Sequence, residues 1–320
     1  MSDREEKTGK NDNGKKNKGG KRNKIVAIEM IILVLLIMAA VAIFIQRDKS
    51  VKEAAKIHNQ KAKKTEQTPQ AAQKENEIEE ETEGTEEETG DRDASVPDRS
   101  NFAVQPGVSV GTTEQSDEKI VYLTLDDGPS DNTQAVLDKY NAKATFFVTG
   151  EMPEYKDMIK AAYDKGHTIG MHTYSHDYAK VYASVDAYFQ DLDQIGQMVQ
   201  EEIGYVPCFI RFPGGSSNTV SKKYTAGIMS TLVQEVQNRG YQYYDWNGSS
   251  GDGSVRTTEE LVAQATSFDS NNIILLCHDS HGKQTTVEAL PQIIEHYQSL
   301  GYTFKALDRD SFVAHHGVNN

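Results

Sequence analysis

Cysteine and tryptophan are scarce in this chain of 320 residues, which has two of the first and one of the second. Two cysteines, Cys208 and Cys277, are too few for a disulfide scaffold or a cysteine-rich zinc module. The chain also lacks an excess of basic residues, since 34 lysines and arginines stand against 48 acidic residues, for a formal charge of −14. Whole-protein binding of nucleic acid requires a basic surface, so no nucleic-acid partner is expected.

Apolar residues are fewer than a uniformly folded chain contains. Hydrophobic residues make up 37% of the chain, whereas globular domains have about half. Part of the chain is therefore expected to lie outside any core. The segment Glu75–Asp93 packs eleven acidic residues into 19 positions, and such a segment cannot bury enough apolar area to fold. We expect residues 46–118 to form a disordered charged linker.

One long apolar run, Ile25–Ile45, is interrupted only by Glu29. At about 1.5 Å per residue, 21 helical residues span a bilayer core of about 30 Å. We expect residues 25–45 to be a transmembrane signal-anchor that follows a basic cytoplasmic tail at residues 1–24. A cleaved signal peptide is the alternative, because Ala40-Val41-Ala42 has the small-x-small form of a cleavage site. Basic residues flank the run almost equally, so they barely decide its orientation.

From residue 119 onward, short β-rich runs alternate with helical patterns. This alternation predicts an α/β fold with a parallel sheet, either a barrel or a doubly wound sheet. The predicted strands are Ile120–Leu125, Ala144–Val148, His167–Met171, Cys208–Arg211, Tyr241–Trp246, Ile273–Cys277 and Tyr302–Lys305. The predicted helices are Thr133–Tyr140, Met152–Lys165, Ser184–Ile203, Ser221–Arg239, Thr258–Phe268 and Thr286–Leu300.

Reactive side chains follow five of these strands, where the carboxyl ends of a parallel sheet gather its chemistry. His172 and His176 have the i, i+4 spacing that allows two imidazoles to bind one metal ion together with a carboxylate. A second carboxylate is then free to take a proton from water, and a histidine on another strand can protonate a leaving group. The same three ligands also suit a ferrous oxygenase, which is the alternative chemistry. The residues concerned are Asp126, Asp127, His172, His176, Arg211, Asp245, Trp246 and His278.

Five motifs occur in one order over residues 119–306, and together they resemble the polysaccharide deacetylase family, also named carbohydrate esterase family 4 or the NodB homology domain. The resemblance implies a distorted barrel of seven β/α units. The first three motifs are Thr124-Leu125-Asp126-Asp127-Gly128-Pro129, His172-Thr173-Tyr174-Ser175-His176 and Arg211-Phe212-Pro213-Gly214-Gly215. The last two are Asp245-Trp246 and Leu276-Cys277-His278.

The resemblance also implies a role for each of these residues. Asp127, His172 and His176 would bind one divalent metal ion, for which zinc is expected and cobalt, manganese and nickel are alternatives. Asp126 would be the general base, oriented by Arg211, and His278 the general acid, tuned by Asp245. The remaining implied contacts are to substrate: the backbone N–H of Gly214 at the oxyanion, and Trp246 and Leu276 around the acetyl methyl group.

The chain departs from the family pattern in three places. The residue after Pro213 is usually aromatic and is Gly214 here, which removes one wall of the substrate groove. The fourth motif usually begins with a second aspartate, and that position is Gln242. Met171 precedes the first histidine, where a polar residue is common. None of these changes removes a catalytic group, but the first two leave the preferred substrate open.

The implied reaction is removal of N-acetyl groups from a polymer of N-acetylglucosamine. A membrane anchor, a long linker and a polysaccharide-acting domain fit together only if residues 119–320 lie outside the cell. We therefore expect a single-pass membrane protein with a cytoplasmic N-terminus, acting on the glycan strands of peptidoglycan. Chitin, acetylated xylan and exopolysaccharide are the alternative substrates, and a non-catalytic wall-binding protein is the alternative function. The sequence predicts no oligomeric state.

Overall fold

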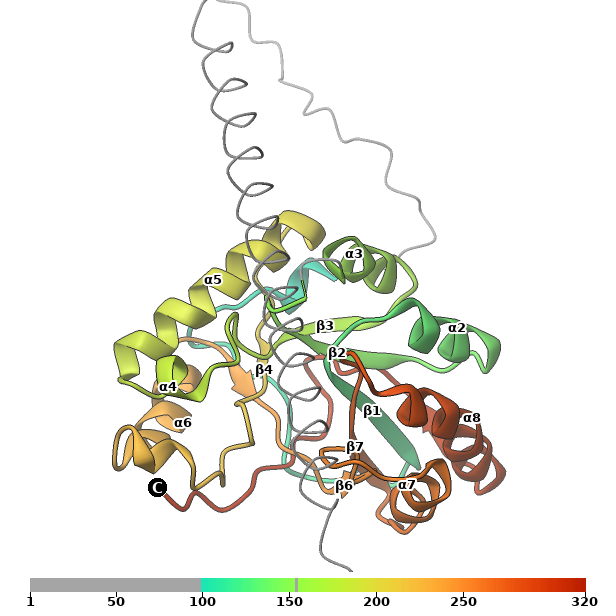
Figure 1. Ribbon diagram of the computed structural model, residues 1–320. Helices are drawn as coiled ribbons and strands as arrows, with labels where there is room; N and C mark the ends of the chain where they lie inside the picture. The colour runs from blue at the N-terminus through green and yellow to red at the C-terminus, as the bar shows by residue number, and fades with distance from the viewer. Residues whose placement is uncertain (1–98, 153–154) are drawn as a thin grey trace, which may run out of the picture. The chain divides into compact units, whose positions relative to one another are not determined.

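The protein is described here by a computed structural model, which describes residues 99–152 and 155–320 (Figure 1). Within them the chain alternates between strands and helices, as the sequence predicts. The strands are β1 (Ile120–Asp127), β2 (Ala144–Val148), β3 (Thr168–Met171), β4 (Phe209–Ile210), β5 (Gln242–Tyr243), β6 (Gly248–Ser249), β7 (Asn272–His278) and β8 (Thr303–Phe304). The helices are α2 (Asp131–Lys139), α3 (Lys156–Asp164), α4 (Tyr178–Val181), α5 (Val185–Ile203), α6 (Ile228–Asn238), α7 (Thr258–Ala265) and α8 (Gln284–Ser299), with short 3₁₀ turns at Ser100–Phe102 and Ser221–Lys223.

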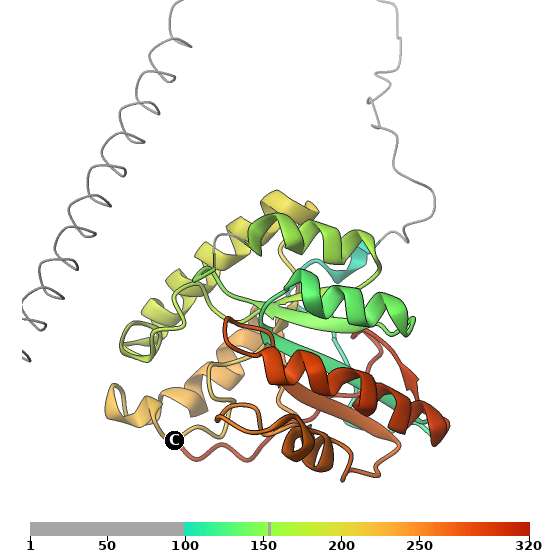
Figure 2. The ribbon, with the colours of Figure 1, turned by 45° about the vertical axis from the view of Figure 1, so that its right-hand side comes forward.

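All the described strands belong to one parallel sheet in the order β5-β4-β3-β2-β1-β7-β6, and β8 pairs with the first residues of β1. The helices lie around the outside of this sheet (Figures 1 and 2). No ladder joins β5 to β6 among the described residues, so the barrel is open on that side. This curled α/β sheet is the distorted barrel that the family resemblance implied.

Local sequence explains where several helices begin and end. Ser184 caps α5 by accepting a hydrogen bond from the backbone N–H of Ala187. Gly204 ends the same helix in the left-handed conformation that glycine adopts readily. Thr257 and Glu260 form a reciprocal capping box at the start of α7. These caps fix where the helices meet the loops at the two edges of the sheet.

The two cysteines are buried free thiols in two different hydrophobic clusters of the core. Burial raises the pKa of the Cys208 thiol to about 12. It also holds the pKa of Cys277 well above its ordinary value. Both side chains therefore serve packing rather than thiol chemistry.

Residues 99–113 correct the predicted boundary of the linker at residue 118. Phe102 and Val110 are buried, and the Phe102 ring packs edge-to-face on Phe209 with 5.3 Å between centroids. The backbone of Phe102 accepts a hydrogen bond from Cys208 N–H, and Thr112 accepts one from Val313 N–H. We call residues 99–113 the strap. The prediction failed here because the strap gains its stability from long-range contacts, which a count of its few apolar residues does not reveal.

The predicted tail, membrane span and most of the predicted linker, residues 1–98, lie outside the described residues. Within residues 99–152 and 155–320, no helix is both long and apolar enough to cross a bilayer. The start of the predicted helix Met152–Lys165 also includes two residues that are not described, and α3 begins at Lys156.

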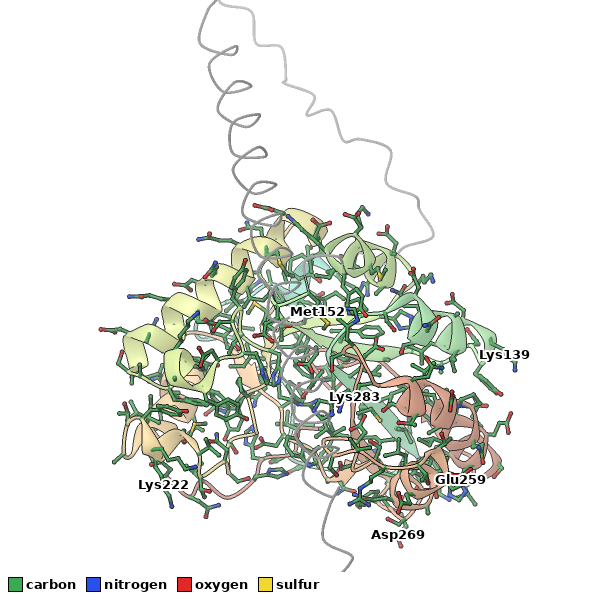
Figure 3. The ribbon with its side chains drawn as sticks, in the orientation of Figure 1. Lys139, Met152, Lys222, Glu259, Asp269 and Lys283 are labelled. Carbon is green, nitrogen blue, oxygen red and sulfur yellow. The ribbon has the colours of Figure 1, made fainter. Side chains whose placement is uncertain are left out.

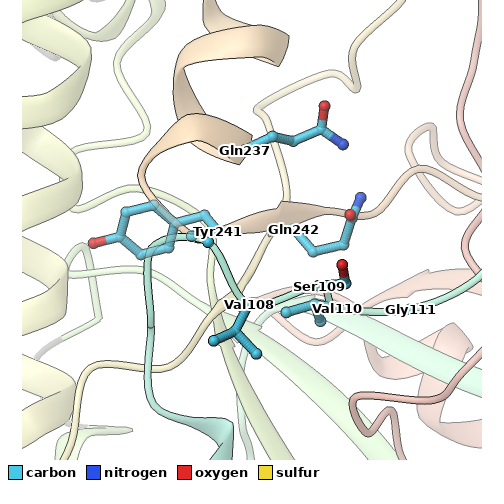
Figure 4. Close-up of a pocket in the computed structure, with 9 residues that line it drawn as sticks. Val108, Ser109, Val110, Gly111, Gln237, Tyr241 and Gln242 are labelled. Carbon is cyan, nitrogen blue, oxygen red and sulfur yellow. The ribbon is translucent and has the colours of Figure 1, made fainter.

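A hollow of about 380 Å³ opens between the strap and the amino end of β5 (Figure 4). It is lined by strap residues, by the end of α6 and by Tyr241 and Gln242. Because α6 leads into the start of β5, this hollow lies at the opposite edge of the sheet from the carboxyl ends, and no candidate catalytic residue lines it.

Candidate active site

Three predicted metal ligands come together at the carboxyl edge of the sheet. Asp127 ends β1, and His172 and His176 follow β3. One donor atom from each residue lies within 4.8 Å of the other two, which is close enough for one ion to contact all three. His172 Nδ1 lies 2.9 Å from the carbonyl oxygen of Arg211, so the ring donates there and leaves Nε2 available as a ligand. Burial lowers the pKa of His172 and so favours the neutral imidazole, which is the form that binds metals.

The loops that carry these ligands are backbone-strained. Asp127, Thr173 and His176 have φ values of 74°, 73° and 46°, in a region that residues other than glycine rarely adopt. Each such residue costs on the order of 1 kcal/mol or more, and the surrounding contacts must hold it in place. For the loop between the two histidines, that contact is a buried carboxylate on α5.

Asp191, on α5, is 9% exposed and contacts the loop between His172 and His176, here called the histidine loop. It accepts hydrogen bonds from the backbone N–H of Tyr174 at 2.5 Å and of Ser175 at 3.1 Å. It also accepts one from the Ser175 hydroxyl at 2.6 Å. One side chain therefore fixes two of the three residues between the histidines, and with them the relative positions of His172 and His176.

Replacement of Asp191 by asparagine is expected to weaken binding of a divalent metal ion, with zinc as the probe, by about 10- to 100-fold, because the amide places its own N–H groups against the donors of the loop. Affinity is measured on the purified chain by competition with a chelating dye. Asp193→Asn, two residues further along α5 and exposed, is the matched control and should bind zinc as the unmodified chain does. Equal affinities for the two variants would show that the loop holds its shape without Asp191.

Asp126 is buried beside the ligands and is paired with an arginine. Arg211, which is fully buried, donates from Nη1 to Asp126 Oδ1 at 2.8 Å and to Thr124 Oγ1 at 2.9 Å. The other oxygen, Asp126 Oδ2, lies 3.6 Å from His172 Nε2. Burial alone would raise the pKa of Asp126, but the charges of Arg211, His172 and His278 together lower it below the ordinary value. Asp126 is therefore an ionised carboxylate at neutral pH, with one oxygen directed toward the metal ligands.

His278 lies at the end of β7 and is held by Asp252, not by Asp245 as predicted. His278 Nδ1 is 2.8 Å from Asp252 Oδ1, and the His278 backbone N–H donates to Asp252 Oδ2 at 2.7 Å. Thr286 donates its hydroxyl to the same carboxylate, and Lys283, labelled in Figure 3, donates to the carbonyl oxygen of Asp252. Burial acts to lower the pKa of His278, but the Asp252 hydrogen bond and the nearby carboxylates raise it overall.

Asp245 performs a different task, so its predicted role beside His278 is corrected. Its carboxylate accepts hydrogen bonds from the Ser216 backbone at 2.8 Å, the Ser216 hydroxyl at 2.5 Å and the His316 backbone at 2.8 Å. These contacts join the loop after Arg211 to the segment near residue 316. The reason for the error is that β5 ends at Tyr243, far from β7 and His278 in the order of the strands. A further short strand, β6, pairs with β7 and leads to Asp252, which therefore lies beside His278.

The three residues implied to contact substrate are spread over two sides of the site. Trp246 is half-buried against the Arg211 guanidinium, 5.7 Å from the ring centroid, and packs edge-to-face on His316. Leu276 is on β7, two residues before His278, and is 6% exposed. Gly214 lies in the loop after Arg211, with φ at +76°.

Sequence reasoning missed Asp191 and Asp252. Asp252 had a detectable signal, since it follows a short run, Gly248–Ser250, in the way that the other reactive residues follow their strands. The sequence does not predict a strand at this run, because glycine and serine have a low preference for strands. Asp191 had no such signal, because one acidic residue on a helix with many polar residues gives no hint that it is buried.

Comparisons with known proteins identify this arrangement. The family model for polysaccharide deacetylase matches residues 113–233. A peptidoglycan-N-acetylglucosamine deacetylase of Bacillus cereus is 29% identical over 65% of this chain and 78% of its own length. A putative polysaccharide deacetylase of Bacillus subtilis is also 29% identical, over 64% of this chain and 72% of its own.

Solved structures agree with the sequence matches. The catalytic domain of a peptidoglycan N-acetylglucosamine deacetylase from Eubacterium rectale is 46% identical, covers 65% of this chain and 97% of its own, and superimposes with a TM-score of 0.62. A polysaccharide deacetylase from Bacillus cereus is 29% identical, covers 63% of this chain and 97% of its own, and has a TM-score of 0.52. With its curled parallel sheet and this arrangement of carboxylates and histidines, the chain belongs to the polysaccharide deacetylase family.

Proposed function

We propose that this polysaccharide deacetylase is a metal-dependent enzyme that removes N-acetyl groups from N-acetylglucosamine residues of peptidoglycan. The observation that carries the proposal is the convergence of three groups at one edge of the sheet. These are the Asp127, His172 and His176 donors, the Asp126–Arg211 pair and the His278–Asp252 pair. A base and an acid on either side of a metal site are what hydrolysis of an amide requires.

The donors fit a divalent ion of the zinc type. Two imidazoles and one carboxylate form the donor set of many catalytic zinc sites, which keep positions open for water and substrate. The hydrogen bond from His172 Nδ1 to a backbone carbonyl fixes the ring with its other nitrogen toward Asp127 and His176. When bound, such an ion polarises the carbonyl and acidifies water. Cobalt, manganese or nickel would fit the same donors.

The residues of the chain move the protons of the reaction. Asp126, ionised and held by Arg211, takes a proton from a water molecule while the oxygen of that water forms a bond to the acetyl carbon. His278, whose pKa is raised above its ordinary value, gives a proton to the nitrogen as the C–N bond breaks. The products are acetate and a free amine on the sugar. Arg211 holds Asp126 in its ionised form, and Asp252 keeps the His278 proton donor oriented.

Peptidoglycan is the proposed substrate because several relatives are named as peptidoglycan N-acetylglucosamine deacetylases. Other relatives are named as a chitin deacetylase and a bifunctional xylanase/deacetylase, so chitin and acetylated xylan are the competing substrates. An external location on a single membrane span accords with a wall substrate and rests on the apolar run at residues 25–45.

The decisive experiment incubates purified peptidoglycan, chitin oligomers and acetylated xylan separately with the purified full chain. Mass spectrometry should show loss of acetyl from N-acetylglucosamine in muropeptides, with acetate released in equal amount. Preferential release from xylan or chitin would redirect the substrate assignment. Binding to peptidoglycan without any release of acetate would instead identify a non-catalytic wall-binding protein.

Removal of the metal is expected to lower the rate of acetate release by about 10³-fold, because the ion contributes several kcal/mol to the transition state. The chain is treated with a chelator, dialysed and assayed before and after zinc is returned. Zinc at 100 times its dissociation constant should also stabilise the fold by about 2.7 kcal/mol, measured as a rise in melting temperature. His176→Ala should lose that rise, and full activity of a metal-free chain would contradict the proposal.

A further inference from the structure

Tyr178 lies beside the metal ligands and has no role in the chemistry described so far. It is the first residue of α4, two positions after His176. Its half-buried ring packs edge-to-face on the His176 ring, with 6.0 Å between centroids, and on the Tyr182 ring, with 5.5 Å. Tyr182 in turn donates its hydroxyl to the carbonyl oxygen of Pro213 at 2.8 Å. The Tyr178 ring is therefore held between the histidine loop and the loop that contains Gly214.

The Tyr178 hydroxyl occupies the space into which a side chain at position 214 would extend. A Cβ atom placed on Gly214 would lie 2.6 Å from Tyr178 Oη and 3.5 Å from Cζ. The first distance is too short for any real contact of a Cβ atom. Glycine at 214 and tyrosine at 178 are thus complementary, because the tyrosine fills the space that a side chain at position 214 would need.

Both residues have an unused hydrogen-bond donor at this point. Among residues 99–152 and 155–320, neither Tyr178 Oη nor the backbone N–H of Gly214 donates to another group of the chain. A phenol hydroxyl and a backbone N–H are both donors that suit a negatively charged oxygen. The Cβ position of Gly214, which lies 2.6 Å from Tyr178 Oη, is one bond from the glycine backbone. The Tyr178 hydroxyl and the Gly214 N–H are therefore close neighbours, on the side of the site that faces His176.

We propose that Tyr178 is a catalytic residue of the deacetylation and a second donor to the oxyanion. Its Oη donates a hydrogen bond to the acetyl oxygen as that oxygen gains negative charge, beside the N–H of Gly214. The proton stays on Tyr178 throughout, so the hydroxyl neither gains nor loses an atom. The ring packs against the sugar that bears the acetyl group. This inference rests on the proposed function of the same site.

Tyr178→Phe tests the hydroxyl while keeping the ring. Removal of one donor to an oxyanion is expected to lower kcat by about 10²-fold, with KM unchanged, because the hydrogen bond strengthens only in the transition state. Tyr140→Phe is the matched control. It removes a surface hydroxyl that bonds Glu295 at the end of α2 opposite the site, and it should leave kcat unchanged. Melting temperatures of both variants confirm that the fold is kept.

A double-mutant cycle with Gly214→Ala tests the contact itself. In the unmodified background the new methyl group collides with Tyr178 Oη, so alanine should lower kcat/KM strongly. In the Tyr178→Phe background that collision is absent, and only the 3.2 Å contact with Asn218 Cβ and the backbone cost at φ +76° remain. The two changes are therefore expected to be non-additive, with a smaller effect of alanine in the second background.

The zinc affinity of Tyr178→Phe distinguishes a hydrogen bond to the oxyanion from a role in which Tyr178 only positions the metal ligand His176. Tyr178→Phe should bind zinc as tightly as the unmodified chain does, whereas a ring that only positions the ligand would act through metal loss. An unchanged kcat, a change confined to KM, or weakened zinc binding in this variant would each overturn the assignment. If the unmodified chain itself releases no acetate from any glycan, the proposed function fails before the variant is judged.

Discussion

Asp126→Asn is expected to lower kcat for acetate release by about 10³-fold, because the amide cannot accept the proton of the attacking water. Asparagine keeps an oxygen that accepts from Arg211 Nη1, so the buried guanidinium retains a hydrogen-bond partner. Substrate binding does not need the charge on Asp126, and KM should change little. The loss therefore belongs to the transition state alone. Steady-state kinetics on N-acetylglucosamine oligomers measure both parameters.

The control for this variant is Asp131→Asn, an exposed carboxylate at the start of α2 on the same side of the sheet. It should retain full activity. Thermal unfolding of both variants separates a catalytic loss from a folding loss, which matters because Arg211 is fully buried and a buried charge without its partner is strongly destabilising. An Asp126→Asn enzyme with nearly normal kcat would assign the base to another residue.

Asp252→Asn is expected to lower kcat/KM by at least about 10²-fold at neutral pH and to move its alkaline limb to lower pH. In the unmodified chain the carboxylate raises the pKa of His278 against the effect of burial. Without that charge, burial is opposed only by Asp126 and Asp127, so the pKa of His278 falls. In the proposed mechanism His278 must be protonated, so its acid form is then lost at a lower pH than before. The measurement is kcat/KM over a range of pH.

Asp269→Asn, an exposed aspartate just before β7, is the control and should leave the pH profile unchanged. Asp245→Asn provides a sharper comparison, because that residue was predicted to hold His278 and instead binds Ser216 and His316. It should leave the alkaline limb in place. A shift of the limb in Asp245→Asn rather than in Asp252→Asn would contradict the geometry of the site.

The convergence of Asp126, Asp127 and His278 at one edge of the sheet could be predicted because each comes at the end of a buried strand. The strands β1, β2 and β7 are buried along nearly their whole length, so their hydrophobic runs mark where they end. The residues that come next are then forced to the same edge of the sheet. Asp126, Asp127 and His278 were placed in this way, without knowledge of any contact.

Asp252, the partner of the proposed general acid His278, could not be predicted by the same reasoning. The strand before Asp252 is two residues long, Gly248–Ser249, and its pairing with β7 depends on backbone hydrogen bonds rather than on side chains. The half-buried Trp246 ends the more apolar predicted strand Tyr241–Trp246, and the family motif Asp245-Trp246 lies there, so the role beside His278 went to Asp245. Likewise Tyr178 and Gly214 are 36 positions apart, and no periodic pattern indicates that one fills the space of the other.

The strap has a mechanical consequence. Its first described residue, Arg99, donates hydrogen bonds to the carbonyl oxygens of Tyr163 and His167 and stacks on the Tyr163 ring, 3.9 Å from the centroid. These groups lie between the end of α3 and the start of β3, at the edge of the sheet opposite the metal ligands. Tension transmitted along the preceding chain would therefore load that far edge first.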